Sequence, residues 1–261
     1  MTEPADAPKF TKARRNRTFA LGVAAGAVLM LGANLAIGAT GNPASSQPTA
    51  TVTITAAPQQ QDQPSDSAAQ QGIGIDLSRR IEGDPTAMGA VDAPVVMVAY
   101  ADYRCPFCSL FEQQTLPIIA AEFVDKGLLR YEFRDMPLFG QQSVDAAVAG
   151  RAAGNQGRFW EFMSAVSANG VVEGGHPDLP RERLIGFAQV AGVPDIAKFT
   201  ADLDDPALLA AVRADLTEGQ KIGFSGVPGF LVGDTPVIGA QPADVFRQVI
   251  NQELDQAGIV R

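Results

Sequence analysis

Residues 93–108 read APVVMVAYADYRCPFC, a run of apolar residues that ends in a polar turn and leads into two cysteines. The run from Ala93 to Tyr100 has the length and β-branched content of a buried strand, and the turn follows at Asp102. Pro106 suits the first position of a helix, because the N–H that proline lacks would have no partner there. The stretch therefore predicts a strand, a turn and a helix that starts at the cysteine pair.

The residues that follow predict a second strand. Apolar residues recur at mostly helical spacing as far as Phe123, and we expect the helix to stop near Gly127. Residues 128–136, LLRYEFRDM, alternate as a strand does. A strand, a helix and a strand in succession indicate a parallel βαβ unit.

The rest of the chain predicts helices and then a hairpin. From about residue 143 to 223 the sequence is rich in Ala and helical in pattern, which indicates an inserted all-helical subdomain. Residues 229–232 and 236–238 flank Gly-Asp-Thr as a short hairpin, and residues 242–256 read as a closing amphipathic helix.

The two cysteines of the chain sit three positions apart, at the predicted start of a helix. At this spacing their sulfurs can close a small ring, and Cys105 faces the unpaired N–H groups and positive end of the helix dipole. Both features favour a thiolate. Cys105 is therefore predicted to be the attacking or leaving sulfur of thiol–disulfide exchange, and Cys108, one turn inward, to resolve the mixed disulfide.

Structural and metal-binding interpretations compete with this one. A structural disulfide would gain little from closing so short a loop. Zinc needs about four ligands, and beyond the thiols the chain offers only His176, which is better explained as an exposed loop residue. Copper would need a nearby Met or His, and Tyr103 and Phe107 provide neither. We therefore predict no metal and no cofactor.

The first 72 residues predict a membrane anchor and a tether. Residues 19–39 are apolar except for one Asn, long enough to cross a bilayer, and all five Lys and Arg of residues 1–18 precede them. This charge bias predicts a cytoplasmic tail at 1–18 and an extracytoplasmic remainder at the cell membrane, although a cleaved signal peptide would start in the same way. Residues 40–72 are rich in Pro, Ser, Thr and Gln and predict a disordered linker to a domain at 73–261.

The charge of the remaining chain argues against one class of partner. Residues 71–261 carry 15 Lys and Arg against 25 Asp and Glu. With no basic stripe to displace counterions, we expect no nucleic-acid partner.

Four stretches together resemble the DsbA-like branch of the thioredoxin superfamily, which includes membrane-anchored bacterial members. They are the segment ADYRCPFC at 101–108, RDMPL at 134–138, the Phe159-Trp160 stretch, and GVPGF at 226–230. The resemblance implies an α/β thioredoxin-like fold with an inserted helical subdomain and a cis-proline loop. Pro228 matches the cis-proline, and the backbone of Val227 would bind an extended substrate segment.

The resemblance also implies an activity and partners. It implies a thiol–disulfide oxidoreductase that works as an oxidase: the Cys105–Cys108 pair introduces disulfides into exported proteins with unpaired cysteines and is reoxidised by a membrane partner of DsbB or vitamin K epoxide reductase type. A reductase or isomerase kept reduced by a membrane donor, and a binding module with an incidental dithiol, are the alternatives.

Two positions depart from the family. Strongly oxidising members often have His between the cysteines, whereas here the redox-tuning dipeptide is Pro106-Phe107, so we expect a less acidic Cys105. The buried acid six positions before the first cysteine is replaced by Ala99; Asp102 can handle the proton instead or can serve the turn. Trp160 is expected to pack in the core rather than to contact substrate.

Overall fold

The computed structural model of the protein describes residues 74–170 and 175–259, and within them five strands form one mixed sheet. The strand order is β1-β3-β2-β4-β5, with β2 and β3 parallel and the other neighbours antiparallel. The strands are β1 (Ala87–Met88), β2 (Val95–Ala101), β3 (Leu129–Asp135), β4 (Gly229–Val232) and β5 (Thr235–Ile238). The predicted βαβ unit and C-terminal hairpin are confirmed.

The helix after β2 is continuous but not uniformly α-helical. It comprises α1 (Pro106–Leu110), the π-helical η1 (Phe111–Thr115), α2 (Leu116–Ile119) and the π-helical η2 (Ala120–Val124). The segment η1 ends just before Pro117, which lacks the N–H that a regular α-helix would use. Gly127 follows with a φ of 71°, so the predicted end of the helix is confirmed.

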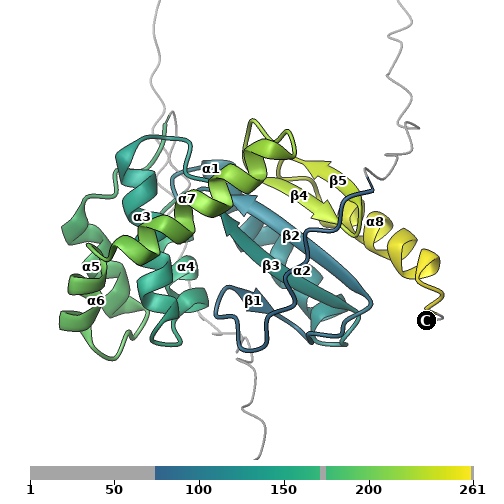
Figure 1. The fold of residues 1–261 in the computed structure, drawn as a ribbon, viewed down its shortest axis with the longest axis horizontal. Coiled ribbons are helices and arrows are strands. Elements are labelled where there is room, and N and C mark those ends of the chain that lie inside the picture. Colours follow the sequence, from purple (N-terminus) through teal and green to yellow (C-terminus); the bar gives the residue numbers. More distant parts are fainter. Residues whose placement is uncertain (1–73, 171–174, 260–261) are drawn as a thin grey trace, which may run out of the picture. The chain divides into compact units, whose positions relative to one another are not determined.

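The helical insert lies between β3 and β4, as predicted. Its helices are α3 (Gln141–Gly154), α4 (Phe159–Ser167), α5 (Arg181–Val190), α6 (Ile196–Asp202) and α7 (Pro206–Lys221), and α8 (Ala243–Gln256) closes the chain. Figure 1 shows α3 to α6 gathered at one end of the sheet and α8 at the other.

Both faces of the sheet are covered. On one face the rings of Phe111, Phe230 and Phe246 pack with centroids 4.5–5.2 Å apart, which joins η1, β4 and α8. On the other face Tyr100 packs on Phe224 and lies so close to Gly219 of α7 that a side chain there would collide with it. The strand β2 is consequently buried along its whole length, as its apolar composition indicated.

The predicted membrane anchor at 19–39, the predicted tail at 1–18 and the predicted linker at 40–72 lie outside the described residues. Among residues 74–170 and 175–259, every helix is too short or too polar to cross a bilayer.

Candidate active site

The end of β2 and the start of α1 position the two cysteines. Cys105 is the N-cap of α1, and its N–H donates to the carbonyl of Asp102 at 3.0 Å, which closes the turn after β2. Pro106 is the first residue of the helix, as predicted. Both cysteines are free thiols, and their exposed fractions are only 2% and 4%. A partner must therefore bring its sulfur into contact with this surface to react.

The two thiols differ in acidity. A hydrogen bond from the Cys108 side chain, helped by the backbone N–H groups of Cys108 and Phe107 and opposed by burial, lowers the pKa of Cys105 to about 7. Burial, followed by the hydrogen bond with Cys105, raises the pKa of Cys108 well above its usual range. Cys105 is thus the more acidic thiol of the pair, and Cys108 is the thiol that keeps its proton.

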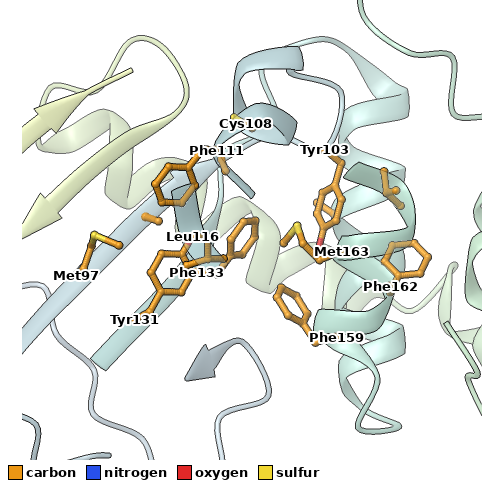
Figure 2. Packing of buried hydrophobic residues seen from close by; sticks show 14 of the residues in the cluster. Met97, Tyr103, Cys108, Phe111, Leu116, Tyr131, Phe133, Phe159, Phe162 and Met163 are labelled. Atoms are coloured by element: carbon orange, nitrogen blue, oxygen red, sulfur yellow. The ribbon is translucent and has the colours of Figure 1, made fainter. Parts of the chain in front are cut away.

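Cys108 belongs to the hydrophobic core. Figure 2 shows it beside Phe111 at one end of an aromatic cluster that includes Tyr131 and Phe133. Trp160 packs against this cluster, 5.8 Å from Tyr131 between ring centroids, so its expected core role is confirmed.

The loop before β4 meets the N-terminus of α1. The peptide between Val227 and Pro228 is cis, as the family resemblance implied. The Cys105 thiol donates to the carbonyl of Val227 at 3.5 Å. The hairpin supports this loop, because Gly239 N–H donates to the Pro228 carbonyl at 2.8 Å. Residues 122 positions apart in sequence are therefore neighbours at the reactive sulfur.

Phe107 forms an apolar tip at this surface. Its exposed fraction is 64%, one of the highest among large apolar side chains of the described residues, and Pro106 beside it is partly buried. The ring has no hydrogen-bond donor for the thiolate, in keeping with the moderate pKa of Cys105.

Asp102 serves the turn in this structure. Its carboxylate accepts backbone N–H groups from Arg104 at 2.8 Å, Leu138 at 2.7 Å and Phe139 at 3.3 Å, so it ties the active-site turn to the segment after β3. Burial raises its pKa, and these hydrogen bonds oppose the rise. Its part in proton handling stays a prediction.

Glu112 is the acid that the sequence analysis missed. It lies one helical turn after Cys108, and burial raises its pKa to about 8. Tyr131 donates to its carboxylate at 3.4 Å, and the pKa of Tyr131 is raised by burial and by both Glu112 and Cys108. In the sequence Glu112 looks like a surface residue beside Gln113, and only its spacing from Cys108 could have singled it out.

His176 is exposed and in a loop, as expected, but it is not remote from the cysteines. Its Nδ1 lies 3.0 Å from the carbonyl oxygen of Arg104, the residue before Cys105. The described residues contain no cluster of His, Cys, Asp and Glu suited to a metal ion.

A family model described as Thioredoxin matches residues 82–252. The chain belongs to the thioredoxin family. It is 27% identical to Disulfide bond formation protein D of Bacillus subtilis (strain 168) over 185 residues, which cover 67% of the chain and 78% of that protein. It is also 33% identical over 162 residues to the Na(+)/H(+) antiporter NhaA of Herminiimonas arsenicoxydans, covering 62% of the chain but spanning only 24% of the antiporter.

Solved structures show the same likeness. The chain superposes on oxidised BdbD from Bacillus subtilis with a TM-score of 0.61 and 25% identity, covering 67% of this chain and 95% of that one. For alpha-DsbA1 of Wolbachia pipientis the TM-score is 0.58 at 23% identity, covering 66% and 92%, which shows the shared fold. The structural likeness to BdbD, together with the sequence match to the disulfide bond formation protein, places the chain among the DsbA-like thiol–disulfide oxidoreductases.

Proposed function

We propose that this protein introduces disulfide bonds into exported proteins through exchange at Cys105 and Cys108. One observation carries the proposal: the two thiols differ sharply in acidity, and the acidic one lies against the carbonyl of Val227. The relative named for disulfide bond formation supports the direction of the reaction.

In the proposed reaction a substrate thiolate attacks the Cys105 sulfur of the disulfide form. The bond between the two cysteines breaks, and Cys108 leaves with the electron pair and takes up a proton, as its raised pKa favours. A second substrate thiolate then attacks the mixed disulfide, and Cys105 leaves as a thiolate. The substrate gains a disulfide and loses two electrons and two protons, and the protein becomes the dithiol.

Substrate proteins would bind through backbone contacts at Val227 and apolar contacts at Phe107. Backbone recognition tolerates many sequences, which suits a protein that acts on varied substrates. The buried position of Cys105 requires an unfolded or extended segment rather than a folded surface.

The compartment and the recycling partner complete the proposal. Residues 19–39 would anchor the chain as a single-pass protein with the domain at 73–261 outside the cell membrane, where thiols are not kept reduced. A membrane protein of DsbB or vitamin K epoxide reductase type would reoxidise the dithiol. If residues 19–39 are instead a cleaved signal peptide, the exported domain would perform the same reaction without a tether.

A reductase or isomerase is the second candidate, and one observation favours it. The pKa of Cys105, about 7, is close to the value of ~7 typical of thioredoxin and far above the ~3.5 of DsbA. Such a protein would need a membrane electron donor to stay reduced.

Oxidation of a reduced, unfolded secretory protein by the full-length disulfide form tests the proposal. We expect disulfides to form in the substrate, Cys105→Ser to abolish the reaction, and Cys108→Ser to trap a mixed disulfide on Cys105. Faster reduction of insulin than oxidation of the substrate would instead support the reductase. Unchanged biological function of Cys105→Ser would indicate a binding module.

A further inference from the structure

The one histidine of the chain is held against the active-site motif. Its ring stacks on Phe139 with centroids 3.7 Å apart and an interplanar angle of 22°. Its Nδ1 lies 3.0 Å from the carbonyl oxygen of Arg104, immediately before Cys105. His176 therefore contacts the reactive turn although it lies 71 positions after Cys105 in the sequence.

The surroundings of His176 fix the ring. The Arg104 guanidinium donates to the carbonyl of Pro177 at 2.8 Å and also to the carbonyl of Phe139. The N–H of Phe139 is in turn bound by the Asp102 carboxylate at 3.3 Å. Pro177, which follows His176, and Phe139, which stacks on its ring, thus belong to one hydrogen-bonded unit with the turn that carries Cys105.

This arrangement selects one tautomer of the neutral ring. A carbonyl oxygen can only accept, so the Nδ1 of His176 must carry the hydrogen that binds Arg104. The Nε2 of the neutral ring is then left with a free lone pair, on a side chain that is exposed to solvent. A backbone carbonyl on Nδ1 is the arrangement that commonly orients the other nitrogen for proton transfer.

Other groups around Cys105 are poorly suited to this task. The Asp102 carboxylate is occupied by three backbone N–H groups, and Phe107 has no acid–base group. Glu112 lies one turn beyond Cys108, which is buried in the core. The exposed side of the site therefore lacks a base among these neighbours, apart from the imidazole.

We propose that Nε2 of His176 accepts the proton of the incoming substrate thiol as its sulfur attacks Cys105. This deepens the proposed function and rests on it. The substrate S–H bond breaks, a bond forms between the substrate sulfur and Cys105, and the bond to Cys108 breaks with the electron pair on Cys108. The imidazolium then returns the proton to solvent, while Cys108 is protonated.

The size of the effect is bounded by thiol ionisation. An ordinary thiol of pKa about 8.5 is roughly 3% ionised at pH 7, so a base that delivers it as thiolate can raise the rate at most roughly 30-fold. For an aromatic thiol that is already fully ionised at pH 7, the same base can contribute almost nothing.

The experiment compares an alkyl thiol with an ionised aromatic thiol as the attacking group. The full-length disulfide form is mixed at pH 7 with glutathione, an ordinary alkyl thiol, or with thionitrobenzoate, an ionised aromatic thiol. We measure the rate constant for attack on Cys105 in the wild type and in His176→Asn, whose amide N–H can replace Nδ1–H toward Arg104 but supplies no base. We expect a loss of about tenfold with glutathione and of less than about twofold with thionitrobenzoate.

Two further variants support the comparison. His176→Gln tests the same loss of a base if His176→Asn does not fold, which the unfolding temperature will show. Asp178→Asn changes a charge in the same loop without altering the ring, and we expect both rates to be unchanged.

Equal loss with both thiols would overturn the proposal, because it would make His176 only a positioning residue. Unchanged rates in His176→Asn and His176→Gln would overturn it as well. If the wild type reacts with neither thiol, the proposed exchange at Cys105 itself fails, and that outcome is distinct from a failure confined to the histidine variants.

Discussion

The sulfur of Cys105 lies 3.5 Å from the carbonyl oxygen of Val227. In the dithiol this carbonyl accepts the thiol hydrogen, whereas the disulfide has no hydrogen to offer. The carbonyl of Val227 is then free to accept an N–H from an extended substrate segment, next to the sulfur that the substrate attacks. The contact therefore links the oxidised state of Cys105 to an available backbone acceptor.

The reduction potential should be lower than that of DsbA. With a pKa of about 7, ionisation of Cys105 stabilises the dithiol at pH 7 by only about 10 mV, against about 100 mV for a pKa near 3.5. Starting from about −120 mV for DsbA, we expect a value of roughly −200 mV for this protein. Equilibration of the full chain in glutathione buffers measures it. A value at or above about −120 mV would contradict the moderate acidity of Cys105.

The reactivity of Cys105 should change near neutral pH. Its pKa falls from an ordinary 9.0 to about 7 in the folded dithiol, so the resulting stabilisation is lost as the pH falls through 7 and grows above it. We expect the rate of alkylation of the reduced protein to have its midpoint at about pH 7. Cys108→Ala removes the main hydrogen bond and should move the midpoint upward. An unchanged midpoint would show that the helix terminus alone sets the acidity.

Replacing Phe107 with a residue that can donate a hydrogen bond should raise the reduction potential of the protein. In Phe107→His, an imidazole would replace the exposed ring and could donate to the Cys105 thiolate. A hydrogen bond to a charged group contributes about 1.5–3 kcal/mol, which corresponds to a potential higher by roughly 30–60 mV. Phe107→Leu, which adds no donor, is the control and should leave the potential within about 10 mV of the wild type. Equal shifts in both variants would indicate loss of the Phe ring as the cause.

Local patterns were sufficient for the elements that carry the cysteines. The apolar run of β2, Pro106 at the helix start and Gly127 at its end each follow from backbone chemistry that acts over a few residues. The approach of Val227 to Cys105 could be expected only from the family resemblance, because contacts over such a separation depend on the whole fold.

The contacts of residues with two plausible environments could not be predicted from the sequence. Glu112 and His176 are a helical acid and a loop histidine, and nothing local distinguishes them from ordinary surface residues. Strand β3 is a further case in which the sequence pattern was misleading. Its charged residues Arg130, Glu132 and Arg134 alternate as on a solvent-facing side of a strand, yet all three are buried. Their burial depends on pairing with one another and with the segment before β1, which no local pattern reveals.

The buried ion pairs around Glu132 should be important for stability. Although burial opposes its ionisation, hydrogen bonds from the backbone N–H groups of Arg79 and Arg80 and from the side chains of Arg130 and Arg134 lower its pKa to about 2. Glu132→Gln removes the counter-ion of buried Arg130 and one of the two acidic partners of buried Arg134, which also pairs with Glu218. We therefore expect a loss of about 3–5 kcal/mol in the free energy of unfolding.

Denaturant unfolding of the full chain measures this loss. Glu161→Gln removes an exposed pair with Arg158 and is the control, with an expected change of at most about 1 kcal/mol. Comparable effects of the two variants would mean that the buried pairs contribute no more than surface pairs.

Glu112 should affect both the pH dependence of stability and the second step of exchange. Because burial raises its pKa from about 4.5 to about 8, the folded protein holds a proton that the unfolded chain releases between these values. Wild-type stability should consequently fall as the pH rises from 4.5 to 8, and Glu112→Gln should lack this fall. The variant should therefore gain unfolding temperature relative to the wild type as the pH rises.

Cys108, whose pKa is raised well above its usual range, also needs a base when it attacks the mixed disulfide, and Glu112 is placed one turn away.

We expect Glu112→Gln to slow the release of a glutathione molecule bound to Cys105 by roughly tenfold or more, since general bases typically contribute at least that much. The control is Glu122, an exposed carboxylate on the same helix as Glu112 that pairs with Arg247 of α8. Glu122→Gln should leave this release unchanged. Stopped-flow measurement of glutathione release at pH 7 distinguishes the two. Equal rates in Glu112→Gln and the wild type would show that solvent, rather than Glu112, takes the proton of Cys108. A stability difference that persisted in that case would still indicate a raised pKa for the Glu112 carboxylate, because the two measurements depend on different properties of the same group.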